Sequence, residues 1–154
     1  MFDLHLFRTE CRSLAPRQAR VPVPDLAGWF PDGADPVWVV RGLVGSEFAR
    51  ANDAASRTRL FAATVDALAS AAHSDQADAL KRMLGADGEP PDDLAKRFDH
   101  LVFGSVDPAI AREDAVWLFA TYPVVAYQLT NKILELTGLG PDLGKARNST
   151  GPQT

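Results

Sequence analysis

The sequence predicts a mainly α-helical fold: a small single-domain bundle of about five helices, with an irregular N-terminal arm that contains one or two short strands. The chain has 154 residues, which fits one domain, and its 46% apolar and 23% charged residues are typical of globular proteins. Apolar residues recur at helical spacing after residue 42, whereas prolines and turn residues interrupt residues 1–42. We therefore expect an arm over 1–42, a helical domain over 43–139 and a flexible, polar, Gly/Pro-rich tail over 140–154.

Charge and hydropathy argue against several function classes. The formal net charge of -4 is unlike the basic face of a nucleic-acid binder. No apolar run approaches the roughly 18 residues of a membrane span, and the N-terminal MFDLHLFRTECR lacks the apolar core of a signal peptide. Cys11 is the single cysteine and cannot form an internal disulfide. We expect an intracellular protein whose partners include neither nucleic acid nor membrane.

The arm shows short extended patterns separated by turn chemistry. Alternating apolar residues over 2–6 predict an imperfect strand, and the polar and basic residues 8–20 predict a loop. Residues 21–24, Val-Pro-Val-Pro, are expected to be extended, because a residue that precedes proline is pushed out of the α region. Residues 25–30 are expected to form a short helical turn. The β-branched and aromatic run over 37–40 predicts a strand.

Three helical segments are expected between the arm and residue 112. A long alanine-rich stretch predicts a helix from about 46 to 72, and a second helix follows over 75–84. A third begins around Asp92 and Asp93, whose charges suit a helix N-terminus. Asp107-Pro108 resembles an N-cap followed by proline at the first helical position, and it predicts the start of the next helix.

The stretch from Glu113 to Gly138 is the most apolar and most helical part of the chain. Pro123 predicts a break between two helices, since proline ends a preceding helix and suits the first turn of a new one. Beyond it, one helical face carries apolar residues at i, i+4, i+8 and i+11, namely Val125, Leu129, Ile133 and Leu136. Gly138 is expected to end the second helix.

No residue pattern indicates catalysis or metal binding. His5, His73 and His100 lie on different predicted elements without a second ligand at metal spacing. The carboxylate pairs Asp92/Asp93 and Glu113/Asp114 sit where helices begin, so the helix dipole explains them. Nucleophile-elbow and phosphate-loop motifs are absent from the sequence. We predict a protein that is not an enzyme, with no metal, cofactor or small-molecule substrate.

Aromatic residues are the more informative candidates. Most are expected to be core, but tyrosine and tryptophan also dominate binding hot spots. Trp29 and Phe30 lie in a proline-flanked segment and are the best candidates for an aromatic pair that docks on another chain, or on the helical core. Trp38 is added to this predicted partner-binding set.

Two blocks of the sequence resemble the tail assembly chaperones of long-tailed bacteriophages, over roughly Pro36 to Gly140. The first block is Val40-Arg41-Gly42-Leu43 with Glu47 to Asn52. The second, stronger block comprises Gly104 to Pro108, Arg112 to Val116, Tyr122-Pro123 and Tyr127 to Gly138. The chain departs from the family where Val44 replaces an expected capping threonine, a role that Ser46 would take over. Trp117, Phe119 and the valines after Pro123 are also more apolar than expected, which indicates a deeper core or a stickier surface.

The resemblance implies a non-enzymatic chaperone in the cytoplasm of the bacterial host. Such proteins bind the tape measure protein and keep it soluble while tail-tube subunits assemble around it, and self-association is a further possibility. Because the resemblance is strongest along the polar edge after Tyr127, Gln128 and Asn131 join the predicted partner-binding residues. Two other functions stay open: a structural virion component of the tail or connector, and a small-molecule enzyme with a polar pocket built from two of His73, His100, Asp99 or Glu113.

Overall fold

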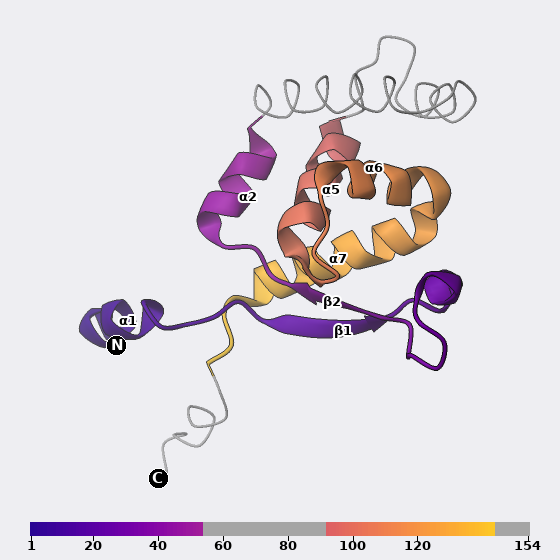
Figure 1. Cartoon of the computed structure of the whole chain (residues 1–154). Helices are drawn as coiled ribbons and strands as arrows, with labels where there is room; N and C mark the ends of the chain where they lie inside the picture. The colour runs from indigo at the N-terminus through magenta and orange to yellow at the C-terminus, as the bar shows by residue number, and fades with distance from the viewer. Residues whose placement is uncertain (54–91, 144–154) are drawn as a thin grey trace.

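The computed structural model describes residues 1–53 and 92–143, and within these ranges the chain is mainly helical with one small sheet (Figure 1). The predicted class is therefore correct in its helical content. Residues 1–42 hold two strands, within the predicted one or two, but only the strand over 37–41 lies where a strand was predicted. A third strand was not predicted. The described elements are, in chain order, α1 (Leu4–Cys11), β1 (Gln18–Pro22), the 3-10 helix η1 (Pro24–Trp29), β2 (Val37–Arg41), α2 (Gly45–Asn52), α5 (Asp92–Gly104), β3 (Ser105–Asp107), α6 (Arg112–Thr121) and α7 (Pro123–Leu139).

The three strands form an antiparallel sheet in the order β1-β2-β3. Val21 pairs with Trp38 across β1 and β2, and Asp107 pairs with Val39 across β2 and β3, where the register shifts next to Val40. The prediction that Asp107-Pro108 opens a helix is wrong. Residues 105–107 instead complete the sheet, and the next helix begins at Arg112.

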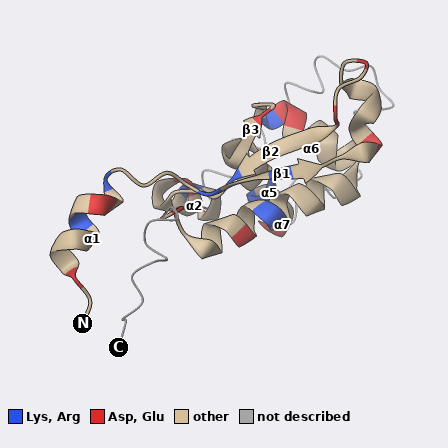
Figure 2. Cartoon of the chain, turned by 90° about the horizontal axis from the view of Figure 1, so that it is seen from below, with Lys and Arg blue, Asp and Glu red and all other residues tan. Residues whose placement is uncertain are grey.

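The N-terminal prediction of a strand over 2–6 is also wrong, because residues 4–11 form helix α1. Asp3 accepts a hydrogen bond at 2.9 Å from the backbone N–H of Leu6 and so caps the helix. The predicted loop over 8–20 consequently shrinks to the residues between Cys11 and Gln18. Helix α1 projects from the start of β1, away from the other elements, in both overall views (Figures 1 and 2).

Helix α7 is the centre of the described core. It packs against α5, α6, β1 and β2, and in Figure 1 it lies between the helices α5 and α6 and the two strands. The four apolar residues predicted for its inner face are all buried, and α6 and α7 meet at Pro123 as predicted. The helix runs one residue beyond the predicted stop, to Leu139, and Gly140 follows it at φ 72°, a conformation that glycine adopts without strain. One hydrophobic cluster joins arm and helix residues, including Val23, Leu26 and Val40 from the arm and Phe98, Phe119 and Leu129 from the helices.

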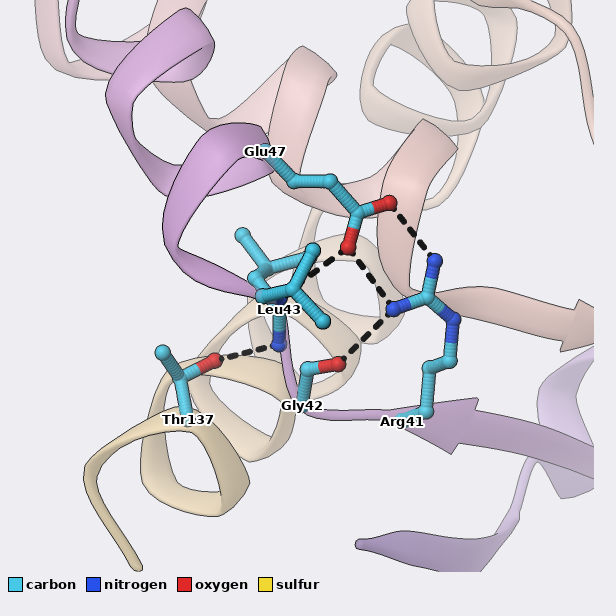
Figure 3. Close-up of polar contacts among 6 residues, drawn as sticks. Arg41, Gly42, Leu43, Glu47 and Thr137 are labelled. Carbon is cyan, nitrogen blue, oxygen red and sulfur yellow. Dashed lines mark hydrogen bonds and ion pairs between the residues drawn. The ribbon is translucent and has the colours of Figure 1, made fainter. Parts of the chain in front are cut away.

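The junction of β2 and α2 is held by the first block of the resemblance (Figure 3). Arg41 donates to both carboxylate oxygens of Glu47, at 2.8 and 2.7 Å, and these hydrogen bonds lower the pKa of Glu47. Glu47 also accepts from the backbone N–H of Val44 at 3.0 Å. Val44, not Ser46, is therefore the residue at the N-cap, and the acid three positions later satisfies its N–H.

Helix α2 ends earlier than predicted. Asp53 takes an extended conformation directly after Asn52, so a continuous helix from 46 onwards does not form there. Asp92 and Asp93 occupy the first turn of α5, as predicted. The remainder of the predicted helix to residue 72, the predicted helix over 75–84 and the tail from residue 144 lie outside the described residues. Among the helices that the structure describes, none combines the length and hydropathy needed to cross a bilayer.

Candidate functional site: an aromatic groove

A groove of about 630 Å³ lies between η1, the end of the sheet and helix α6. Its volume falls within the usual range of ligand-binding clefts, roughly 300–1,000 Å³. It contains all three tryptophans of the chain, Trp29, Trp38 and Trp117. The other lining residues are Leu26, Phe30, Asp107, Pro108, Ile110, Asp114, Leu118, Thr121 and Tyr122. The surface is thus apolar and aromatic, with two carboxylates.

Local sequence places η1 at the edge of this groove. The extended Val-Pro-Val-Pro run leads into Pro24, which occupies the first position of η1, where its missing N–H costs no hydrogen bond. Leu26 turns inward and is buried, whereas Trp29 is 77% exposed. The indole Nε1 of Trp29 donates to the hydroxyl of Tyr122 at 3.1 Å, which ties η1 to the α6–α7 junction.

Helix α6 presents apolar side chains on two faces. One face carries Ala115 and Phe119 into the core. The other carries Asp114, Trp117, Leu118 and Thr121, at i, i+3, i+4 and i+7, into the groove. The sequence left open whether Trp117 and Phe119 belong to a deeper core or a stickier surface. Phe119 lies in the core, whereas Trp117 is half-buried and lines the groove.

The structure brings together the three aromatic residues that the sequence singled out, but in different roles. Trp29 is the exposed member, and Phe30 is half-buried against the hydrophobic core. Trp38 is 7% exposed, and its Nε1 donates to the Ser105 hydroxyl at 3.1 Å, so it forms the floor of the groove rather than a surface contact. Sequence reasoning missed Ile110, Leu118 and Tyr122 as groove residues. The absence of a polar face on α6 was the available signal for Leu118.

The other two predicted partner-binding residues, Gln128 and Asn131, are exposed on α7 and do not line the groove. Arg97 of α5 donates to the side-chain oxygens of both Asn131 and Thr130 at 2.8 Å. The same guanidinium lies over the ring of Tyr127, 4.6 Å from its centroid. Asn131 therefore helps to join α5 to α7, which gives this part of the polar edge a structural role.

None of Asp99, His100 and Glu113, the described residues named for an enzyme, lines the aromatic groove. Asp99 pairs with Arg112, and Glu113 is exposed on the first turn of α6, while His73 lies outside the described residues. Over 1–53 and 92–143, no three His, Cys, Asp or Glu side chains come together as metal ligands would. His100 is buried and stacks parallel to Phe48, with ring centroids 6.3 Å apart.

Burial lowers the pKa of His100 to about 4, with a smaller contribution from the positive charge of Arg97. In the unfolded chain its pKa returns to about 6.5. Between these values the unfolded state binds the additional proton, so stability is complete above pH 6.5 and falls as the pH is lowered towards 4. We expect the melting temperature to drop from pH 7.5 to pH 5, and to drop less in His100→Phe, which keeps a ring against Phe48. Equal pH slopes in the two proteins would show that His100 does not control this window.

Comparison of the chain with models of known protein families, with curated proteins and with solved structures gave no match.

Proposed function

We propose that the chain is a non-enzymatic assembly chaperone that holds an apolar helical segment of another protein in the aromatic groove. The observation that carries this proposal is the gathering of Trp29, Trp38, Trp117 and Tyr122 around one open groove of about 630 Å³. Tryptophan and tyrosine are the residues most enriched among interface hot spots. A helix that displays apolar side chains at i, i+3, i+4 and i+7 is the natural occupant of a groove lined in this way.

The resemblance to phage tail assembly chaperones gives this occupant an identity. We propose that it is a segment of the tape measure protein, which the chaperone keeps soluble in the host cytoplasm while tail-tube subunits assemble around it. A long helical client of this kind exposes apolar stripes until the tube covers them. Trp29 supports such a role because the residue is 77% exposed and yet its indole is hydrogen-bonded to Tyr122, so little side-chain entropy is lost when a client packs on it.

The test is binding of purified chaperone to a fragment of the tape measure protein with which it is co-expressed. Trp29→Ala is expected to weaken the complex by at least about 30-fold, the effect of a hot-spot residue worth 2 kcal/mol. Trp29→Ala is preferable to a double change with Phe30, because Phe30 also packs on the core. Tyr122→Phe, which removes only the hydroxyl that holds the indole, is expected to give a smaller loss.

The matched control is Val124→Ala, which trims an apolar side chain that is 66% exposed on α7 and does not line the groove. Its affinity for the fragment is expected to equal that of the unchanged chain. Undiminished binding by Trp29→Ala would place the client elsewhere on the protein. Many copies of the chain in purified virions, counted by mass spectrometry, would instead favour the structural virion component.

A further inference from the structure

Helix α1 carries an apolar stripe that the other described elements leave exposed, although its last residue, Cys11, borders a small pocket with Val44 and Leu136. None of its residues is buried, and Leu4 and Phe7 are 50% and 49% exposed. Leu4, Phe7 and Cys11 stand at i, i+3 and i+7 and so share one face, to which Phe2 adds its ring, 5.3 Å from that of Phe7. Isolated helices shorter than about 12–15 residues are marginal in water, so the eight residues of α1 need a packing partner to be stable.

The aromatic groove matches this stripe in hydrophobicity and is opposite to it in charge. It is lined by apolar and aromatic side chains, and its described lining includes two carboxylates, Asp107 and Asp114, but no basic residue. Arg8 lies one position along α1 from Phe7 and four from Leu4, which places it at the edge of the apolar stripe. A helix that inserts this stripe therefore carries a positive charge towards a groove whose only charged residues, among the described lining, are carboxylates.

The groove of the same molecule is out of reach of α1. The segment between α1 and β1 is pinned, because Ala15 accepts from the N–H of Asp142 at 3.3 Å and Arg17 accepts from the N–H of Gly42 at 2.9 Å. Only residues 12–14 remain as a free connection, and three residues span at most roughly 10 Å. The floor of the groove lies near the far end of β1, because Trp38 pairs with Val21, three residues or roughly 10 Å along the strand from Gln18. A three-residue connection pinned at Ala15 therefore cannot bring the whole stripe, Cys11 included, into that groove.

We propose that α1 of one copy packs its Leu4, Phe7 and Cys11 stripe into the aromatic groove of a second copy, with Arg8 beside Asp107 and Asp114. The exchange is reciprocal, so each copy donates one helix and accepts one, and the dimer closes under two-fold symmetry. This proposal rests on the proposed function only because both place a helix in the same groove. The exchange would also regulate the chaperone, since α1 covers the groove of the free protein and a client must displace α1 before it can bind.

The position of the tryptophans provides a direct readout. All three line the groove, and α1 contains none, so tryptophan emission reports groove occupancy without interference from the helix. In reducing buffer, dilution of the full chain is expected to convert dimer to monomer in sedimentation velocity and to shift the tryptophan emission to longer wavelength over the same concentrations. Phe7→Ser is expected to weaken the dimer by at least about 30-fold.

Leu6→Ser is the matched control. Leu6 is 44% exposed, similar to Phe7, but it lies on the opposite side of α1 from the stripe, so the dimer is expected to persist. A synthetic peptide of residues 1–13, titrated into the full-length Phe7→Ser chain, is expected to restore the emission of the occupied groove. A monomer at every concentration, or a dimer that Phe7→Ser leaves intact, would overturn the exchange.

The two proposals fail in distinguishable ways. If the chain stays monomeric but binds the tape measure fragment through Trp29, the helix exchange is wrong and the chaperone function stands. If the dimer forms through Phe7 but no fragment binds, the exchange stands and the proposed client is wrong. Where both hold, Phe7→Ser is expected to bind the fragment more tightly than the unchanged chain, since no helix competes for the groove.

Discussion

Arg112→Ala is expected to cost about 3–5 kcal/mol of folding free energy, the usual effect of breaking a buried ion pair by removal of one partner. The side chain of Arg112 is 15% exposed and that of Asp99 only 4%, and the two form a charge-assisted hydrogen bond between α6 and α5. Without the guanidinium, the buried Asp99 carboxylate loses this charge-assisted hydrogen bond. Urea unfolding of the two proteins measures the difference.

The control for this change is Lys132→Ala, which removes an equal charge from an exposed ion pair. Lys132 and Glu135 are 35% and 57% exposed, one turn apart on α7. Water and salt screen such a pair, so its loss is expected to cost less than about 1 kcal/mol. If both variants unfolded at the same urea concentration, the pair between α5 and α6 would contribute no more than a surface contact.

Gly42→Ala is expected to destabilise the protein by about 1–3 kcal/mol, as overpacking of a tight interior does. A Cβ atom at this position would lie 3.0 Å from the carbonyl carbon of Leu136 and 3.1 Å from the backbone N of Thr137. These are backbone atoms of α7, which cannot turn aside as a flexible side chain can. The neighbouring N–H of Leu43 donates to the Thr137 hydroxyl at 2.9 Å (Figure 3). This hydrogen bond holds the end of β2 against α7 and opposes the backbone shift that an added methyl group would require.

Gly45→Ala is the matched control for Gly42→Ala. It lies three residues further along, at the start of α2, and a Cβ atom there would have nothing within 4 Å. Alanine also favours a helix over glycine, so this variant is expected to be as stable as the unchanged chain or slightly more so. Thermal melts of both variants would contradict the close-approach argument if Gly42→Ala retained the original melting temperature.

The sequence predicted elements that local chemistry specifies. Pro123 divides two helices because it cannot continue the first and suits the start of the second. The face from Val125 to Leu136 is buried because four apolar residues at helical spacing share one side of α7. The strand over 37–40 and the turn over 25–30 follow from β-branched residues and from Pro24 in the same way.

Misplaced elements depended on partners far away in the sequence. Residues 105–107 pair with β2, which lies more than sixty residues earlier in the sequence. The residues around Asp107 give no local signal of this pairing. Residues 18–20 were predicted to be loop because they are polar, yet they begin strand β1. An edge strand of an antiparallel sheet needs only one covered face, and β1 accordingly alternates between exposed and half-buried residues. At the N-terminus the apolar alternation over 2–6 was too short to outweigh the helix cap of Asp3.

The candidate site divides along the same line. The sequence by itself determined that Trp29 and Phe30 would sit in a proline-flanked, irregular segment, because each proline fixes its own backbone and that of its neighbour. Only the tertiary structure decided that η1 faces α6, and hence that Trp29 meets Tyr122 across 93 positions of chain to border a groove. The same packing placed Trp38 on the floor of that groove and Asn131 on Arg97, outside it. Whether a side chain borders the groove, forms its floor or joins two helices depends on the distant elements that pack against it, and local periodicity does not identify those elements.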